Sequence, residues 1–406
     1  MSKLLYFNIP STGHVNPTLP VIRELVSRGH EVVYVNTESH RAAIEATGAK
    51  FIPYPESDFM ESYMDESAGR GDIVRNMYDL VRLSEKLYPY CQELIRSESP
   101  DGLIHDSLAS WGMLAGKHAG IPRVAFFTTF VLTAKTYRPK LRVALDLLVK
   151  YCLVIPEYLL FSARMRARQG IFPASLPAAG MCIGDLNIVF TSREFQPSGL
   201  LFSEDYKFVG PTVQHRKEHA DFDYSSLNKR PLVYISLGTL ARNPGFFRTC
   251  FEAFGQEDGL FILSVGKQAD ISELGAVPGN FIVRQSVPQL GILQRADIFV
   301  THGGLNSVHE SLMHGVPMIA IPQQPEQAVV AVEMERHGAG IALQTSPPYG
   351  TVDAESLRKA LKTILSSPDY RKRAHSLGNS LDRSGGVEAA VEHIAGYLGE
   401  RRSAAA

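Results

Sequence analysis

The stretch IFVTHGGLNSVHESLMHGVPMIAIPQQPEQ, residues 298–327, decides how the second half of the chain folds. It opens with Ile298 to Thr301, which has the length and the apolar composition of a buried strand. Two glycines then allow the backbone to turn sharply, and Asn306 and Ser307 are good N-cap residues for a helix. A His-Gly-Val-Pro sequence marks the end of that helix, and the apolar run Met318 to Ile321 follows. The stretch therefore predicts a strand, a turn, a helix and a second strand.

The turn before this helix has two interpretations. A strand, turn and helix in this order leave backbone N–H groups and the positive end of the helix dipole directed at the turn, which suits an anion such as a phosphate. Ser307 and Glu310 also match the S-x-x-E capping box, in which the two side chains satisfy backbone donors at the helix start without any ligand. The stretch alone leaves both interpretations open.

The composition favours two domains and a small-molecule partner. At 406 residues the chain exceeds one ordinary core, so we expect two domains with a cleft between them. There are 41 Lys and Arg against 42 Asp and Glu, so the net charge of −1 creates no overall field for nucleic acid or an anionic membrane.

The N-terminus and the cysteines predict a cytoplasmic protein. The 4 cysteines lie far apart without a C-x-x-C pair, which argues against a zinc site or a disulfide framework and fits a reducing cytosol. Residues 1–9 lack the regions of a signal peptide, and no apolar run approaches the roughly 20 residues that span a bilayer. Val143 to Phe161 is interpreted as a core-facing helix, with a membrane-surface helix as the alternative. We expect no integral membrane association.

The first half of the chain alternates strands and helices, which predicts a doubly wound parallel sheet. Its predicted strands are Lys3–Asn8, Glu31–Val35, Phe51–Pro53, Gly102–His105, Arg123–Phe127 and Leu186–Phe190. Asn16 and Pro17 are predicted to start the first helix as N-cap and N1 residues. Ligands bind at the carboxyl ends of the strands in such sheets.

His14 and Asp106 both follow predicted strands in this half. If those strands are close together, Asp106 can hold the proton on one imidazole nitrogen while the other accepts a proton from a substrate hydroxyl. That arrangement would make His14 a general base. The alternatives are a histidine that is hydrogen-bonded in a turn and an aspartate that only caps the next helix.

Two segments of the first half lack clean periodicity. They are Phe59 to Met77 and Thr128 to Ala179, the second with scattered aromatic residues and prolines. Segments of this kind often line a site for a bulky apolar ligand. Ordinary core packing is the alternative for many of the aromatic side chains.

A polar segment, 212–230, separates a second series of strands and helices from the first and is predicted to be a linker. The predicted strands of this series are Leu232–Ser236, Phe261–Val265, Phe281–Arg284, Ile298–Thr301, Met318–Ile321 and Ile341–Leu343. We expect domains at residues 1–211 and 231–385 and a last helix within 386–400. The Ala-rich tail after Arg402 is predicted to be disordered.

Polar residues also follow strands in this half. Ser236 and Thr239 lie in a glycine turn that could contact phosphates or form a simple turn. Glu326 and Gln327 follow a strand and could bind the vicinal hydroxyls of a sugar or be ordinary surface residues. The absence of the G-x-G-x-x-G and P-loop motifs from the sequence disfavours a dinucleotide dehydrogenase and a P-loop NTPase.

Taken in order, these motifs resemble those of the family 1 UDP-sugar glycosyltransferases, and more narrowly their bacterial macrolide and flavonoid glucosyltransferase subgroup. The motifs are His14, Asp106, SLGT at 236–239, VPQ at 287–289 and HGGLNS at 302–307. The resemblance covers essentially the whole chain. It implies the α/β GT-B fold, in which two Rossmann-like domains face each other across a cleft and the last helix packs back on the N-terminal domain.

The resemblance also implies roles for the site residues. His14 would be the catalytic base on the acceptor hydroxyl, with Asp106 as its partner. The donor contacts would be Ser236, Thr239, His302, Asn306 and Ser307 for the phosphates, Val287 and Gln289 for uracil, Glu310 for the ribose, and Glu326 and Gln327 for the sugar. Gly304 would allow close approach of the backbone. Two positions depart from the family pattern: Ser286, where plant members often have a stacking aromatic residue, and Val330, where many members have Asn.

The predicted reaction is the inverting transfer of a hexose, with glucose favoured, from a UDP-sugar to a hydroxyl of a lipophilic acceptor such as a flavonoid or a macrolide. The UDP-sugar is a substrate, and no cofactor is expected. No D-x-D pair stands where a metal would bridge the diphosphate, so no obligatory metal is expected. The alternatives are an isomerase similar to UDP-sugar 2-epimerases, which needs no acceptor, and a non-catalytic sugar-nucleotide-binding protein.

Overall fold

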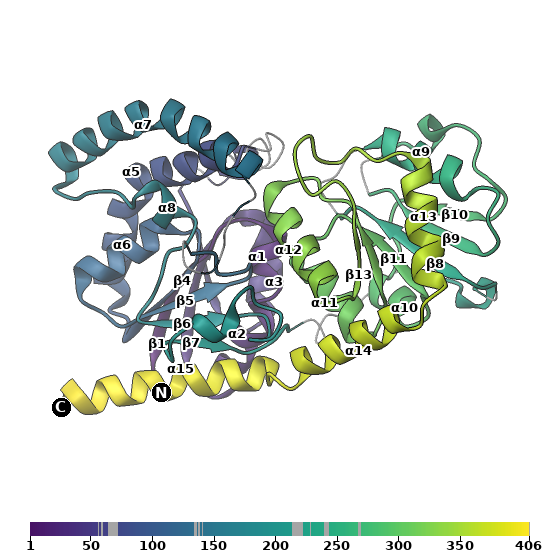
Figure 1. The fold of residues 1–406 in the computed structure, drawn as a ribbon. Helices are drawn as coiled ribbons and strands as arrows, with labels where there is room; N and C mark the ends of the chain where they lie inside the picture. Colours follow the sequence, from purple (N-terminus) through teal and green to yellow (C-terminus); the bar gives the residue numbers. More distant parts are fainter. Residues whose placement is uncertain are drawn as a thin grey trace. The chain divides into compact units, whose positions relative to one another are not determined.

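The computed structural model describes residues 1–55, 57, 60–63, 72–133, 136, 139, 141–212, 222–227, 229–238, 243–266 and 269–405. The chain forms two compact units, Met1–Thr212 together with Ser384–Ala406, and Val213–Arg383. Each unit contains one parallel sheet with helices on both faces (Figure 1). Parts of several predicted features lie outside the described residues: 213–221 and 228 of the linker, Thr239, 59 and 64–71 of the first aperiodic segment, 134, 135, 137, 138 and 140 of the second, and 406 of the tail.

The first unit is built on a seven-stranded sheet with the order β3-β2-β1-β4-β5-β6-β7. The strands are β1 Lys3–Phe7, β2 Glu31–Asn36, β3 Lys50–Pro53, β4 Gly102–Asp106, β5 Arg123–Phe127, β6 Leu186–Val189 and β7 Tyr206–Phe208. The inner strands are nearly continuous apolar runs because helices cover both of their faces. The order reverses between β1 and β4, so the carboxyl ends of these two neighbours form the switch point where such sheets bind ligands.

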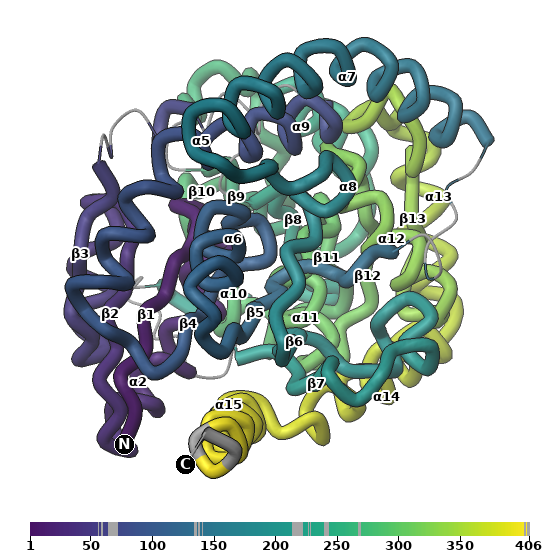
Figure 2. Tube along the Cα trace, turned by 90° about the vertical axis from the view of Figure 1, so that its left-hand side faces the viewer, coloured from purple at the N-terminus to yellow at the C-terminus, as the bar shows by residue number. Residues whose placement is uncertain are grey.

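Helices cover the two faces of this sheet. The helical segments of the first unit are α1 Thr12–Val15, α2 Leu19–Ser27, η1 Glu38–His40, α3 Arg41–Glu45, α5 Ile73–Glu98, α6 Ser110–Ala119, α7 Leu141–Gln169, α8 Leu176–Ala179, η2 Gly199–Leu201 and α15 Gly386–Ala405. Helices α2 and α15 pack on one face, and α5 and α6 pack on the other. Helices α7 and α8 pack on α5 instead of on the sheet, and Figures 1 and 2 both show α7 on the outer side of α5.

The second unit is built on a six-stranded sheet with the order β10-β9-β8-β11-β12-β13. The strands are β8 Leu232–Ser236, β9 Leu260–Ser264, β10 Phe281–Arg284, β11 Ile298–Thr301, β12 Met318–Ala320 and β13 Gly340–Ala342. The helical segments are η4 Tyr224–Ser226, α9 Pro244–Phe254, η5 Ile271–Leu274, α10 Gln289–Leu293, α11 Leu305–Met313, α12 Pro325–Arg336, α13 Ala354–Leu365 and α14 Asp369–Asp382. Helices α9 and α13 cover one face, and α11 contacts α10, α12 and α14. The switch point lies between β8 and β11.

The structure corrects two predicted helix starts. Helix α11 begins at Leu305 with Gly304 as its N-cap, so Ser307 lies inside the first turn and the predicted capping box is wrong. Gly303, with φ at +83°, turns the chain directly into the helix, which moves the start upstream of the polar residues. Helix α2 begins at Leu19 with Thr18 at its N-cap position, because residues 12–15 already form the short helix α1.

One other prediction about a helix is also wrong, since α15 continues to Ala405 where a disordered tail was predicted. Val143 to Phe161 lies in α7, which faces a core cluster on one side, as predicted, through Val154 and Phe161. The other long side of α7 is exposed. Within the described parts of the chain, no helix has the combination of length and apolarity that crossing a bilayer requires.

Candidate active site

His14 and Asp106 meet at the switch point of the first sheet. Helix α1 follows β1 and carries His14, and Asp106 is the last residue of the neighbouring strand β4. Nδ1 of His14 lies 2.8 Å from Oδ2 of Asp106, so the predicted contact between the two side chains is confirmed. Oδ1 of Asp106 accepts a hydrogen bond of 2.8 Å from the N–H of Leu108. Each oxygen of this buried carboxylate therefore has a defined partner.

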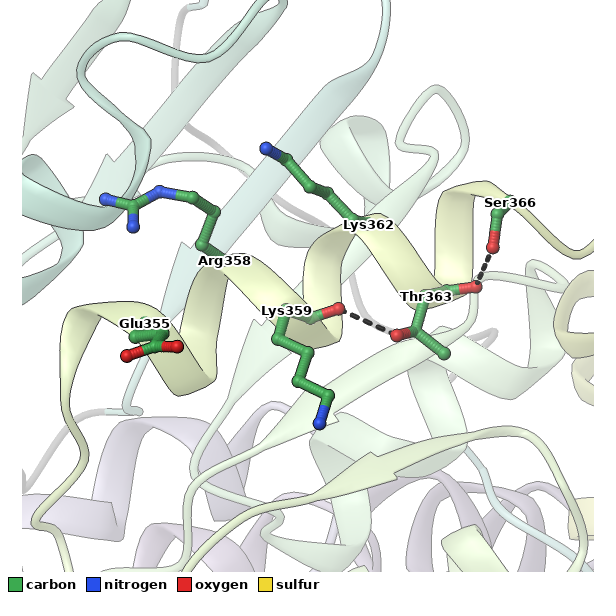
Figure 3. A pocket seen from close by; sticks show the side chains of 6 residues that line it. All are labelled: Glu355, Arg358, Lys359, Lys362, Thr363 and Ser366. Carbon is green, nitrogen blue, oxygen red and sulfur yellow. Dashed lines mark hydrogen bonds between the residues drawn. The ribbon is translucent and has the colours of Figure 1, made fainter.

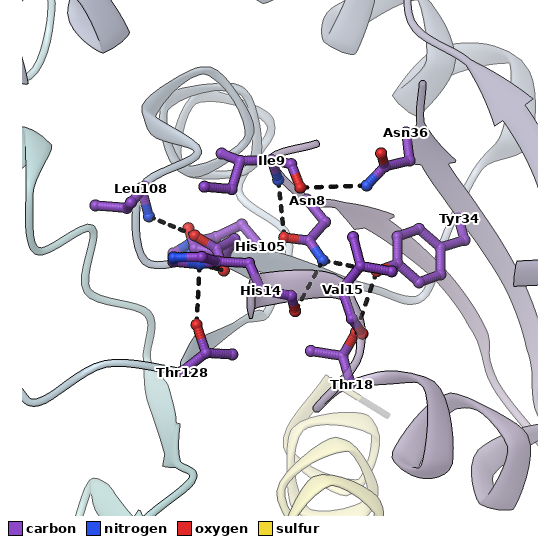
Figure 4. A network of polar contacts seen from close by, with 11 residues as sticks. Asn8, Ile9, His14, Val15, Thr18, Tyr34, Asn36, His105, Leu108 and Thr128 are labelled. Atoms are coloured by element: carbon purple, nitrogen blue, oxygen red, sulfur yellow. Dashed lines mark hydrogen bonds and ion pairs between the residues drawn. The ribbon is translucent and has the colours of Figure 1, made fainter. Parts of the chain in front are cut away.

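A third strand contributes Thr128 to the same site. Thr128 follows β5, the strand next to β4, and its Oγ1 lies 2.9 Å from Nδ1 of His14 (Figure 4). Asp106 and Thr128 thus both engage Nδ1. Since a carboxylate only accepts hydrogen bonds, this nitrogen carries the proton, and Nε2 is the ring nitrogen that acts as a base.

Neutral polar groups hold the backbone around His14. The side-chain NH2 of Asn8 donates to the hydroxyl of Tyr34 at 2.6 Å and to the carbonyl oxygen of His14 at 3.4 Å (Figure 4). The Tyr34 hydroxyl also lies 3.1 Å from Oγ1 of Thr18. Burial raises the pKa of Tyr34 and of Cys182, and the charge of Asp106 raises each pKa further. Both groups therefore remain neutral beside the Asp106 carboxylate.

The second unit has a close-packed turn at its own switch point. His302 follows β11 and its ring lies against two glycines, because a Cβ on Gly304 would collide with Nε2 and a Cβ on Gly238 would lie 2.8 Å from Cε1. Burial lowers the pKa of His302 to about 4, so the ring is neutral at neutral pH. It can therefore donate a hydrogen bond to an anion without carrying a charge. Gly304 was predicted to admit a ligand to the backbone, and in the structure it makes room for His302.

The first turn of α11 places Asn306 and Ser307 beside this histidine. The N-cap residue Gly304 has no side-chain oxygen, so no side chain of the cap residue closes the helix start. The first N–H groups of a helix have no acceptor within the helix, and they lie at the positive end of its dipole. This geometry retains the anion-binding interpretation and removes the capping box that competed with it.

Other predicted donor residues border the same turn. Ser236 ends β8, pairs in register with Thr301, and its Oγ accepts a hydrogen bond of 3.4 Å from the N–H of Gly238. A Cβ on Gly303 would lie 3.1 Å from the carbonyl oxygen of Gln327, so the turn lies against the start of α12. Glu326 and Gln327 are in the first turn of α12, and Oε1 of Gln327 accepts a hydrogen bond of 2.9 Å from the N–H of Gln323.

Gln289 links the remaining predicted residues. Its NH2 donates to Oε2 of Glu310, and its Oε1 accepts a hydrogen bond of 3.1 Å from the hydroxyl of Tyr234. Glu310 is only 2% exposed, and Val287 is buried two residues before Gln289. Helices α10 and α11 are thereby joined by a polar contact that orients both side chains.

Comparison with known proteins identifies the family. The family model for the C-terminal domain of proteins similar to erythromycin biosynthesis protein CIII matches residues 248–385. The chain is 31% identical over 402 residues to the uncharacterized UDP-glucosyltransferase YojK of Bacillus subtilis, and the match covers 97% of each chain. The chain belongs to the family 1 UDP-sugar glycosyltransferases.

Further relatives agree with this assignment. The glycosyltransferase is 28% identical to the oleandomycin glycosyltransferase of Streptomyces antibioticus, over 97% of this chain and 90% of that protein. Among solved structures, the glycosyltransferase of kitacinnamycin matches with a TM-score of 0.79 at 28% identity and covers 97% of this chain and 98% of its own. Its two parallel-sheet units are therefore the two Rossmann-like domains of the GT-B fold.

The two positions that depart from the family pattern, Ser286 and Val330, differ in how exposed they are in this glycosyltransferase. Ser286 is exposed just before the buried Val287. Val330 is 1% exposed inside α12, so this position contributes to the core. It offers no polar contact to a ligand.

Sequence reasoning missed two residues that contact the predicted site residues of this glycosyltransferase. Thr128 was treated only as the start of an aperiodic segment, although its place directly after β5 puts it at the same sheet edge as His14 and Asp106. Tyr234 was treated as an ordinary strand residue. Its ring stacks on Phe299 with centroids 4.8 Å apart, and nothing in the local pattern indicates that its hydroxyl reaches Gln289.

A shallow hollow on α13 of the glycosyltransferase is lined by polar and charged side chains of a single helix and its C-cap (Figure 3). Its lining residues are Glu355, Arg358, Lys359, Lys362, Thr363 and Ser366. Arg358 donates hydrogen bonds to the carbonyl oxygens of Ala253 and Glu252 at the end of α9, so its guanidinium links α13 to α9. None of the predicted site residues lines this hollow. Within the described residues, no group of His, Cys, Asp and Glu side chains is placed to hold a metal ion.

Proposed function

We propose that the enzyme transfers a hexose, glucose in the first instance, from its UDP-sugar to a hydroxyl of a lipophilic small molecule with inversion at the anomeric carbon. The observation that carries the proposal is the contact of Nδ1 of His14 with the buried carboxylate of Asp106. A histidine whose Nδ1 proton is held in this way has its Nε2 available as a proton acceptor of defined orientation.

The proposed reaction begins with proton transfer to His14. As the acceptor oxygen attacks the anomeric carbon, Nε2 takes the hydroxyl proton and the bond between that carbon and the diphosphate oxygen breaks. The imidazole then carries a positive charge, which Asp106 stabilises through Nδ1. The products are the glycoside and UDP, and the proton on His14 is later released to solvent.

The second unit is the proposed donor site. Charge grows on the departing diphosphate, and the N-terminus of α11 with His302, Asn306 and Ser307 supplies hydrogen-bond donors and a helix dipole to stabilise it. Ser236 and Thr239 would contact the same phosphates. These donors are part of the protein, so we propose that turnover needs no added metal.

The remaining donor contacts follow from the resemblance and the local geometry. Glu310 would bind the ribose hydroxyls, and its contact with Gln289 fixes its orientation before the donor arrives. Val287 and Gln289 would hold uracil. Glu326 and Gln327 would hold the hexose, since both lie in the first turn of α12 beside the His302 turn.

The test incubates the purified enzyme with UDP-glucose and a panel of phenolic and macrolide acceptors. We expect products heavier than the acceptor by one hexose, with the β linkage by NMR that inversion of an α-linked donor requires. His14→Ala should abolish most of this product, and EDTA should leave it unchanged. Conversion of UDP-glucose without any acceptor, equal product from His14→Ala, or loss of activity in EDTA that Mg²⁺ restores would each contradict part of the proposal.

A further inference from the structure

Tyr234 of β8 is a buried tyrosine whose ring and hydroxyl have separate partners. The side chain is 2% exposed, and its ring stacks on that of Phe299, the residue paired with it on β11, with centroids 4.8 Å and planes 10° apart. Its neighbours Val233 and Ile235 belong to the core beneath α9 and α13, so the alternation of a strand directs Tyr234 to the opposite face of the sheet. The stack holds the ring in place without using the hydroxyl.

The hydroxyl of Tyr234 begins a chain of hydrogen bonds that leads to Glu310. It donates to Oε1 of Gln289 at 3.1 Å, and Nε2 of Gln289 donates to Oε2 of Glu310. A carboxylate only accepts hydrogen bonds, so the NH2 end of the amide has to face Glu310 and its oxygen has to face Tyr234. Glu310 is also 2% exposed. Two buried groups, one from β8 and one from α11, therefore determine the orientation of the Gln289 amide.

The amide of Gln289 has hydrogen-bonding capacity beyond these two contacts. An amide oxygen has two lone pairs, and an amide nitrogen carries two hydrogens. Tyr234 engages one lone pair, and Glu310 engages one hydrogen. Gln289 itself is half-buried at the first position of α10, so a ligand can reach the rest of the amide. The oriented amide can thus offer a donor and an acceptor to a ligand.

We propose that Tyr234 is a positioning residue of the donor site, which holds the amide of Gln289 in the orientation that binds the nucleoside part of the nucleotide sugar. This inference rests on the proposed function, in which Gln289 and Glu310 contact that part of the donor. Tyr234 acts only through Gln289.

Loss of the Tyr234 hydroxyl changes the protein before any donor arrives. Oε1 of Gln289 then faces the edge of an apolar ring, whereas water satisfies this oxygen when the half-buried side chain turns outward. An outward turn also separates Nε2 from Glu310. A donor that binds only the inward orientation meets a smaller population of it, and its apparent affinity falls by that fraction.

The first test measures UDP binding to the full chain by isothermal titration calorimetry. Tyr234→Phe keeps the ring that stacks on Phe299 and should weaken UDP binding roughly fivefold, the effect of one neutral hydrogen bond. The donor KM should rise by the same factor while kcat and the acceptor KM stay unchanged, because the nucleoside is bound equally in the ground state and the transition state. The control is Tyr54→Phe, at a tyrosine that is also 2% exposed and accepts a hydrogen bond of 3.0 Å from Trp111 in the first unit. It should bind UDP as the wild type does.

The second test separates positioning from packing by a double-variant cycle with Gln289→Ala. If Tyr234 acts through the amide, Tyr234→Phe should not weaken UDP binding further once Gln289 is alanine. A fivefold loss that persists in the Gln289→Ala background would show that the tyrosine acts by packing and would overturn the inference.

Two further outcomes distinguish this inference from the function on which it rests. A wild type that does not bind UDP would overturn the proposed function and the role of Tyr234 with it. A wild type that binds UDP, together with a Tyr234→Phe variant that binds it equally tightly, would overturn the role of Tyr234 alone.

Discussion

Replacing Asp106 with asparagine tests the hydrogen bonds around His14 one atom at a time. In the wild type, Oδ1 accepts from the Leu108 N–H at 2.8 Å, and Oδ2 faces Nδ1 of His14 at 2.8 Å. The asparagine oxygen can occupy only one of these positions, so its NH2 group has to occupy the other.

Both orientations of the new amide are unfavourable. With its oxygen on the Leu108 N–H, the NH2 donates to Nδ1 and forces the imidazole proton onto Nε2, the nitrogen that has to act as the base. With the reverse orientation, the NH2 faces the Leu108 N–H, which loses its acceptor at a cost of about 1–3 kcal/mol. Neither orientation supplies the negative charge that stabilises the imidazolium. We expect kcat/KM to fall by about 10²- to 10⁴-fold, the range for general acid–base catalysis.

Thr128 should limit this loss, because its Oγ1 lies 2.9 Å from Nδ1 and can accept the proton when the carboxylate is gone. Thr128→Val alone removes one neutral hydrogen bond, worth about 1 kcal/mol, or roughly a fivefold change in kcat/KM. The double variant Asp106→Asn/Thr128→Val removes both the carboxylate and the threonine hydroxyl, so Nδ1 keeps an acceptor only when the asparagine oxygen faces it and the Leu108 N–H is left unpaired. Its loss should therefore exceed the product of the two single losses.

The assay measures kcat/KM for UDP-glucose with a series of phenols of decreasing pKa, after thermal unfolding has shown that each variant is folded. A more acidic phenol needs less help in losing its proton, so the effect of Asp106→Asn should shrink along the series. Wild-type activity in Asp106→Asn, or a loss that is the same for every phenol, would refute the reasoning.

Three further predictions follow from the buried groups. Gly304→Ala pushes a methyl group into the His302 ring and should reduce the free energy of unfolding by about 1–3 kcal/mol. The double variant Gly304→Ala/His302→Ala removes this collision and should recover the lost free energy. Equal melting temperatures for Gly304→Ala and the wild type would contradict this. Glu310→Gln should raise the donor KM by roughly tenfold with little change in melting temperature, because an uncharged group holds ribose hydroxyls less tightly; an unaltered donor KM would remove the ribose role. Burial lowers the pKa of His105 to about 4 and of His309 to about 3. Both folded-state pKa values lie below the ordinary histidine value of about 6.5. The free energy of unfolding should therefore have its full value above pH 6.5 and should decrease as the pH falls from there toward 4. A melting temperature that is independent of pH between 7 and 5 would contradict this.

The repeating pattern of the sequence was sufficient to locate the sheets. Runs such as Leu232 to Ser236 and Ile298 to Thr301 are apolar because parallel strands in the middle of a sheet are covered on both faces, and the alternation of strands with helices determines a doubly wound topology. That topology places residues after the strands at one edge of the sheet. The contact between His14 and Asp106 could therefore be proposed from the sequence on the condition that their strands are close, and the structure supplies that condition by pairing β1 with β4.

The features that only the tertiary structure decided depend on side chains that are distant in sequence or on what covers a helix. The start of α11 at Leu305, the contact of Thr128 with His14 and the contact of Gln289 with Glu310 depend on backbone geometry and packing that no local pattern encodes. The exposed side of α7 could not be predicted, because hydrophobic periodicity indicates that a face will be covered but does not identify its partner. The partner is set by the arrangement of whole layers, and on α7 the layer beneath covers only one side.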